Sequence, residues 1–247
     1  MHAACIGGKI CMLKCNSEMC FPFPPFPDPM KNFLILAVLA GVVSGCATQT
    51  ASPIDNTTSA AMLNQQIVQV VHPRPNFTAM TAGKVAFPGG LIGAMMMGAS
   101  GNDIISQNNV QDPAIAIGRE LTKAIALTRG AKVVPSPVTL ESVDAAAIAT
   151  SVQGRAQYVL AVETRVWNFT YFPTDWTHYR VSYAAPLIEV ATGKVLAEGA
   201  CKRTPDSNAG APTYDVLVGS GAAGLKSELA QATTECIATL KNDLLNL

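Results

Sequence analysis

Charge and aromatic rings are scarce in this sequence of 247 residues, of which 14% are charged and 6% aromatic. Lysine and arginine together number 17, and so do aspartate and glutamate. A nucleic-acid-binding surface needs a basic face, so this balance argues against nucleic acid as a partner. The same balance argues against attachment to a membrane through a polybasic patch.

Catalytic motifs are also missing. The chain contains no HExxH motif, no P-loop, no GxSxG motif, and no GxGxxG that leads from a strand into a helix. The segment GSGAAG at 219–224 has the glycines of a phosphate loop but lacks the lysine, and we interpret it as the start of a helix. The sequence therefore predicts a protein that is not an enzyme and has no cofactor or metal.

One apolar run stands out near the start of the chain, from Phe33 to Val43. Lys31 precedes it, and Ser44, Gly45 and Cys46 follow it. A run this short, behind a cation and ahead of small residues, is typical of an export signal and not of a membrane span. A buried helix with an incidental cysteine is the alternative, but the run has no polar face of the kind that a surface helix shows.

The four residues Val43 to Cys46 resemble the bacterial lipobox. That resemblance implies cleavage before Cys46 and attachment of lipid, including acyl chains such as palmitate, to the Cys46 thiol. Alanine, and not aspartate, follows the cysteine, which in the lipoprotein pattern implies transfer to the outer membrane, facing the periplasm. We expect the mature chain to begin at Cys46, with residues 30–45 as its signal peptide.

Residues 1–29 contain four cysteines and the run FPFPPFPDP, which cannot form a helix. Met30 lies directly before the signal, so we predict that Met30 is the true start and that 1–29 is an over-extended reading frame. A metal site is the rival interpretation, but these cysteine spacings match no zinc pattern.

Cys201 and Cys236 are the other two cysteines of the predicted mature chain. Cys201 lies on the same strand face as Ala197 and Gly199, and Cys236 lies on the apolar stripe of the last predicted helix. An exported pair favours a disulfide, while two separate buried thiols are the alternative.

The remaining chain divides into a flexible tether at 46–75, rich in small polar residues, and one α/β domain at 76–247. Within the tether, residues 60–71 have some apolar content and are a candidate short helix or strand. We expect strands at 84–87, 132–134, 158–172, 177–190 and 195–202, and helices at 113–129, 141–152 and 222–245. Helices alternate with strands before an antiparallel meander of three strands and a covering helix. This order predicts an α/β (α+β) fold with one mixed sheet.

Two stretches are candidates for binding. Residues 89–101, GGLIGAMMMGASG, are a packed loop or short helix, a self-association surface of closely spaced small residues, or an apolar surface for lipid or a partner. The first meander hairpin concentrates aromatic residues, which favour protein interfaces, although core packing is the alternative. The partner-binding candidates there are Trp167, Phe169, Tyr171, Trp176 and Tyr179.

The order of elements also resembles that of periplasm-facing outer-membrane lipoproteins, such as the curli-secretion lipoprotein and the activators of penicillin-binding proteins. This resemblance rests on element order and implies the fold. Our first hypothesis for function is a membrane-anchored envelope lipoprotein with a non-catalytic domain that binds a protein partner or self-associates. The alternative is an auxiliary lipoprotein of lipid transport, with acyl chains in an apolar groove lined by Met95, Met96 and Met97.

Overall fold

The computed structural model describes residues 51–80, 90–171, 177–204 and 212–247, with the backbone alone at 90–97, 170–171 and 177–178. Its strands are β1 (Gln66–Val71), β2 (Thr78–Ala79), β3 (Lys132–Val133), β4 (Val138–Thr139), β5 (Tyr158–Tyr171), β6 (Thr177–Glu189) and β7 (Val195–Arg203). Its helices are α1 (Asn56–Ala61), α3 (Gly90–Gln107), α4 (Pro113–Arg129), α5 (Ala145–Val152) and α6 (Tyr214–Leu245).

The strands form one mixed sheet in the order β3-β1-β5-β6-β7, with β2 beside β5 and β4 beside β1. The pairs β1–β5 and β1–β3 are parallel, and β5, β6 and β7 form the antiparallel meander. The expected α/β (α+β) fold with a mixed sheet is therefore confirmed.

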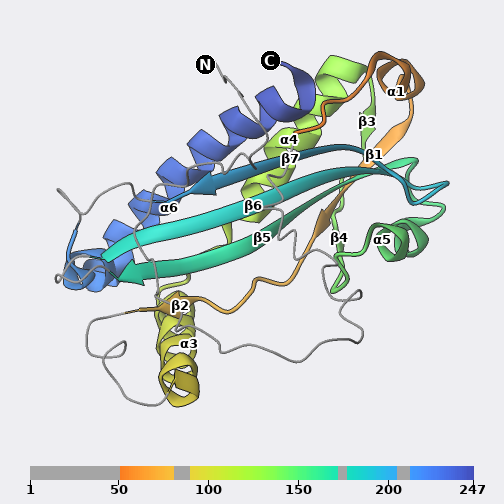
Figure 1. The fold of residues 1–247 in the computed structure, drawn as a ribbon. Coiled ribbons are helices and arrows are strands. Elements are labelled where there is room, and N and C mark those ends of the chain that lie inside the picture. The colour runs from red at the N-terminus through yellow and green to blue at the C-terminus, as the bar shows by residue number, and fades with distance from the viewer. Residues whose placement is uncertain (1–50, 81–89, 172–176, 205–211) are drawn as a thin grey trace, which may run out of the picture. The chain divides into compact units, whose positions relative to one another are not determined.

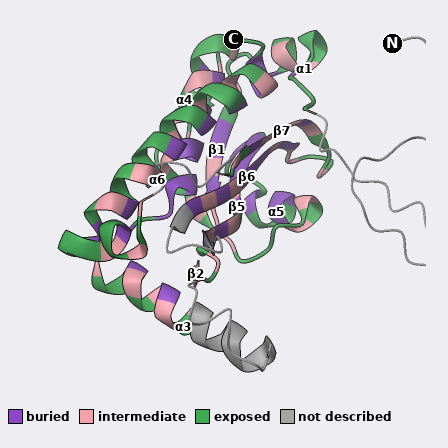
Figure 2. Cartoon of the chain, turned by 60° about the vertical axis from the view of Figure 1, so that its left-hand side comes forward, coloured by how far each residue is buried: buried purple, intermediate pink, exposed green. Residues whose placement is uncertain are grey.

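Helices cover the two faces of the sheet unequally (Figure 1). On one face α4 and α6 enclose the larger apolar core, which includes Ile117 and Leu121 of α4 and Leu187 of β6. On the opposite face the short helix α5 covers a smaller cluster around Val68, Val159 and Ile148. Figure 2 shows the resulting pattern, with buried residues on the sheet side of α4 and α6 and exposed residues outside.

Helix α4 forms where local signals predict it. The Asp112 carboxylate accepts a hydrogen bond from the Ala114 N–H at 2.9 Å, and Pro113 occupies the first turn. Gly130 ends the helix at φ 66°, a left-handed conformation that suits glycine. The predicted bounds of this helix agree with the structure.

Helix α6 begins earlier than the sequence predicts. It starts at Tyr214 and contains a kink at 219–222, where Ser220, Gly221 and Ala222 all have positive φ. Beyond the kink, its buried stripe includes Leu225, Leu229, Cys236 and Leu240, as the apolar spacing predicts. The segment GSGAAG is thus a corner within α6 that leads into its long part.

Cys201 of β7 and Cys236 of α6 are joined by a disulfide, with 5.4 Å between their Cα atoms. Both residues are buried in the larger core. The bond joins the last strand of the sheet to the helix that covers it. This agrees with the expectation from the strand face of Cys201 and the apolar helix stripe of Cys236.

The prediction of a flexible tether over 46–75 is wrong from Ser52 onward. Strand β1 lies inside the sheet between β3 and β5, and its residues Ile67, Val68 and Val70 are fully buried. Ahead of it, the Ile54 N–H donates to the Leu244 carbonyl at 2.9 Å. The domain therefore begins before residue 76, because a middle strand of the sheet comes from the segment that was expected to be loose.

Residues 89–101 were expected to form a packed loop or short helix, a self-association surface or an apolar surface. In the structure, helix α3 begins at Gly90 and continues to Gln107. Gly101 lies against the carbonyl of Phe77, where a Cβ atom would collide with the backbone. This close approach explains the glycine and holds α3 against β2. The strand expected at 84–87 lies outside the described residues.

Candidate functional site

Three of the aromatic partner-binding candidates are core residues. Trp167, Phe169 and Tyr179 expose only 3%, 0% and 3% of their surfaces. The ring of Phe77 packs edge-on against Trp167 and Phe169, with centroids 5.3 Å and 5.0 Å away. The prediction of a partner surface is wrong for these three, because Phe77 covers them. Trp176 and the side chain of Tyr171 lie outside the described residues.

A buried polar cluster joins the start of α4 to β5. The Asp112 carboxylate, which caps α4, also accepts a hydrogen bond from the Thr164 hydroxyl of β5 at 2.6 Å. Burial raises the pKa of Asp112 above its ordinary value of 3.8, and the hydrogen bonds from Thr164 and Ala114 act in the opposite direction. Asp112 therefore links the start of α4 to the sheet through a carboxyl group that is largely shielded from water.

The hydroxyls of Tyr179 and Tyr183 are buried and interact with each other. The indole nitrogen of Trp167 is buried and has no hydrogen-bond partner among the described residues. Burial raises the pKa of both tyrosines far above the ordinary value of 10.0. Both phenols therefore stay protonated at physiological pH, and Asp112 is the group of this cluster whose titration burial moves toward neutral pH.

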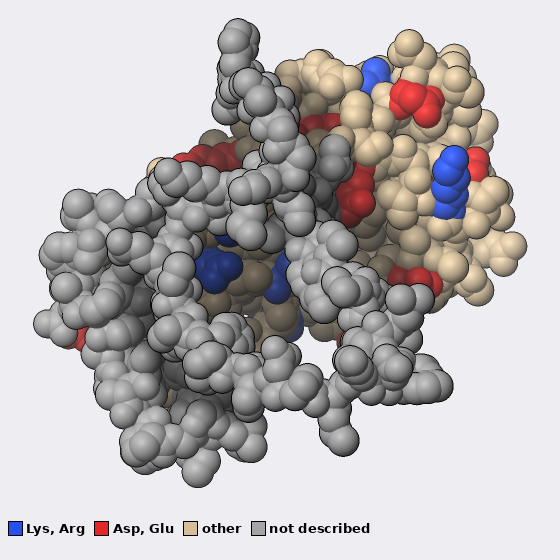
Figure 3. All heavy atoms as spheres, viewed as in Figure 1, with Lys and Arg blue, Asp and Glu red and all other residues tan. Residues whose placement is uncertain are grey.

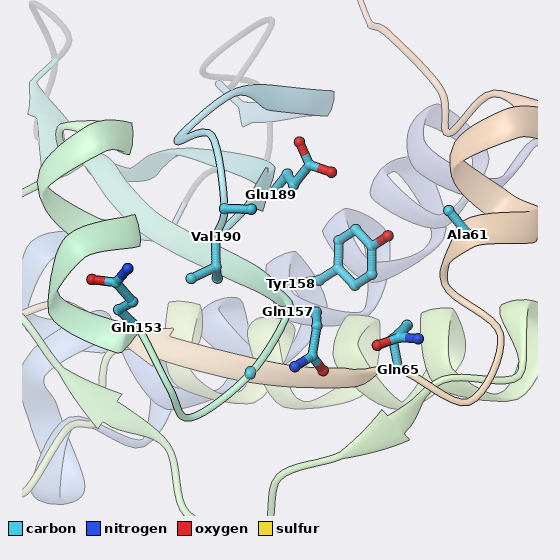
Figure 4. A pocket seen from close by; sticks show the side chains of 9 residues that line it. Ala61, Gln65, Gln153, Gln157, Tyr158, Glu189 and Val190 are labelled. Carbon is cyan, nitrogen blue, oxygen red and sulfur yellow. The ribbon is translucent and has the colours of Figure 1, made fainter.

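A cavity with a volume of about 340 Å³ lies where β1 and β5 begin and β6 ends. Figure 4 shows the Tyr158 ring between Glu189 and Gln157, with Gln65 nearby and Gln153 on the opposite side. Its lining residues are Ala61, Gln65, Gln153, Ala156, Gln157, Tyr158, Glu189, Val190 and Ala191. We call this cavity the glutamine pocket.

Polar groups in the glutamine pocket are partly engaged by the fold. The Gln157 Oε1 accepts the Gln66 N–H at 2.9 Å, and the Glu189 Oε2 accepts the Thr192 hydroxyl at 2.6 Å. Burial, and then the charge of Glu189, raise the pKa of Tyr158. The side-chain amides of Gln65 and Gln153 complete a lining that suits a neutral, hydrogen-bonding ligand group.

A smaller pocket, of about 160 Å³, lies beside α5 and includes His72, Glu163, Arg165 and Glu198. The His72 Nδ1 lies 2.9 Å from the Leu140 carbonyl, and Arg165 pairs with Glu163 at 2.7 Å. Among the described residues, no group of three or more potential ligands is placed to hold a metal ion. On the face drawn in Figure 3, acidic and basic side chains of the described residues are intermixed.

The lipid-related candidates cannot be placed. Cys46 lies outside the described residues, and so do the side chains of Met95, Met96 and Met97. In the part of the chain that the structure describes, no helix is both long and apolar enough to cross a bilayer.

No family model and no curated protein matches the sequence. Among solved structures, the chain is similar to the PelC dodecamer from Paraburkholderia phytofirmans, at 17% identity over 79% of this chain and 95% of that one, with a TM-score of 0.30. It is also similar to protein XCC0632 from Xanthomonas campestris, at 14% identity over 78% and 89%, with a TM-score of 0.35. Lipoprotein GNA1162 from Neisseria meningitidis matches at 17% identity over 69% and 98%, with a TM-score of 0.25.

Proposed function

We propose that this chain is an exported lipoprotein, anchored through Cys46 to the periplasmic side of the outer membrane, whose domain binds a partner without catalysis. The observation that carries export is the disulfide between Cys201 and Cys236. Disulfides persist in oxidising compartments and are rare in the cytosol. The short apolar run 33–43 and the lipobox ending at Cys46 supply the route to that compartment.

The glutamine pocket is the binding site that the described geometry favours. Its amides and the Tyr158 hydroxyl can both donate and accept hydrogen bonds, which suits a neutral group of a protein partner or of a second copy of this chain. Its lining contains no nucleophile beside a base, since Glu189 and Tyr158 are its only titratable side chains. The pocket therefore supports binding and not turnover.

Export and anchoring are tested by fractionating cells that express the full chain or the Cys46→Ser variant. The full chain should fractionate with the outer membrane, and Cys46→Ser should lose the lipid and leave that fraction. Equal amounts of both chains in the outer-membrane fraction would contradict the anchor.

The pocket is tested by placing a photo-crosslinking residue at Gln153 in the anchored protein. Gln231, on α6, is a matched exposed glutamine far from the pocket in the sequence. A specific adduct from position 153 that position 231 does not give would support the site. The same adducts from both positions, or none from 153, would contradict it.

A further inference from the structure

The first described residues attach the start of the domain to one end of the fold. Ser52 exchanges two backbone hydrogen bonds with Glu198 of β7, at 2.8 Å and 2.9 Å. Ile54 is buried and donates its N–H to the carbonyl of Leu244, near the end of α6. The point at which the chain enters the domain is therefore fixed beside the C-terminal end of α6.

Only six residue steps separate Cys46 from Ser52. A fully extended chain spans at most about 3.3–3.6 Å per residue, so this link reaches no farther than roughly 20 Å. If Cys46 carries the lipid, as the proposed function requires, the end of the domain at Ser52 and Ile54 lies within that distance of the bilayer.

Apolar side chains are exposed at this same end. Among the described residues, every leucine that is largely exposed lies here: Leu63 at 59%, Leu127 at 86% and Leu247 at 67%. The Asn64 N–H bonds the Gly130 carbonyl beside Leu63, and the Arg129 guanidinium bonds the Leu245 carbonyl. These contacts join the α1–β1 turn, the end of α4 and the end of α6. Figures 1 and 2 both show these three parts of the chain at the same end of the domain.

Exposed single leucines are ordinary on protein surfaces. Here they coincide with the end that a short link would hold beside lipid. Leucine side chains suit the acyl boundary of a bilayer. The exposed charges of this end include both Lys132 and Asp55, so the apolar side chains carry the argument.

We propose that the end of the domain that carries Leu63, Leu127 and Leu247 docks on the membrane surface. The inference rests on the proposed lipid anchor and adds an orientation to it. The docked end then holds the long part of α6 pointing away from the bilayer. A helix rises 1.5 Å per residue, so the opposite end of that part lies about 30 Å along the helix axis.

The test uses the full lipidated protein in vesicles of phosphatidylethanolamine and phosphatidylglycerol. An environment-sensitive fluorophore is attached to Leu127→Cys or to the control Val216→Cys. Val216 is similarly apolar, is 62% exposed and lies at the other end of α6. Because Cys201 and Cys236 are bonded to each other and Cys46 is acylated, each variant offers one free thiol.

The proposal predicts a blue shift and brighter emission for the label at 127 when vesicles are present, and no change for the label at 216. Labels that both stay in water, or that both shift equally, would overturn it. A shift at 127 that depends on protein concentration without vesicles would assign this end to a second copy of the chain and also overturn it. Protein that fails to float with vesicles at all would contradict the lipid anchor instead.

Discussion

The backbone N–H of Ile54 lies 2.9 Å from the carbonyl oxygen of Leu244, and this bond joins the start of the domain to the end of its last helix. A segment that composition alone describes as a loose spacer is thereby part of the fold. The consequence for function is a short link from Cys46 to the domain, in place of one of about 30 residues.

The first prediction concerns the segment 52–75. A chain that begins at Asn76 should fail to fold, because it lacks β1, which lies between β3 and β5 in the sheet. A chain that begins at Ser52 should fold, since it keeps α1 and β1. Circular dichroism during urea denaturation distinguishes them, and a cooperative transition of equal midpoint in both chains would contradict the assignment.

The disulfide gives a second prediction. Replacing both Cys201 and Cys236 with alanine should lower the free energy of unfolding by about 3–4 kcal/mol, because the bond closes a loop of 35 residues in the unfolded chain. Urea denaturation of the unreduced wild-type protein and of the double variant measures the difference. Reductant should lower the urea midpoint of the wild-type protein and leave the midpoint of the double variant unchanged. A wild-type midpoint that does not change with reductant would contradict a stabilising role for the disulfide.

Much of the fold can be predicted from sequence where the signals are local. Asp112 and Pro113 mark the start of α4, and Gly130 marks its end. The turn at Gly193 separates β6 from β7. For β1, the sequence leaves open a short helix or a strand and does not predict its place in the sheet, because its six residues pair with β5, about 90 positions later.

The candidate site is harder to predict for the same reason. The glutamine pocket draws its lining from three separate segments, and no short motif links Gln65, Gln153 and Gln157. The aromatic residues of β5 and β6 resemble a binding surface in sequence, but Phe77 from another segment covers them. In each case a contact between distant residues decides the outcome.

The third prediction contrasts two hydroxyls near Asp112. Thr164→Val removes the hydrogen bond to the buried carboxylate and should lower the free energy of unfolding by about 1–3 kcal/mol. Tyr183→Phe is the matched control, because it removes a buried hydroxyl that lies near the Tyr179 hydroxyl and gives Asp112 no hydrogen bond. Its loss should change stability by less than about 1 kcal/mol. Denaturation midpoints of the two variants test this order, and a greater loss in Tyr183→Phe would reverse it.

The fourth prediction concerns pH. Because burial raises the pKa of Asp112, the folded protein keeps this proton at pH values where the unfolded chain has released it. The contribution of Asp112 to the free energy of unfolding is therefore fully present below pH 3.8, falls as pH rises through the folded pKa, and is constant above it.

Asp112→Asn removes this titration and keeps an oxygen that can accept the bond from the Ala114 N–H. Urea denaturation of both proteins across that pH window gives the difference in free energy of unfolding. Wild type should lose stability relative to Asp112→Asn as pH rises. A constant difference, or one that grows in favour of wild type, would show that burial is not the dominant influence on this carboxyl group.

Export of the domain and its anchoring through Cys46 underlie both the proposed function and the membrane docking. Mass spectrometry of the N-terminal peptide, from protein purified out of intact envelopes, is the decisive test. The account predicts a chain that begins at Cys46 and carries a diacylglyceryl group on the sulfur. A peptide that runs through Cys46 from an upstream residue, with a free thiol, would contradict it.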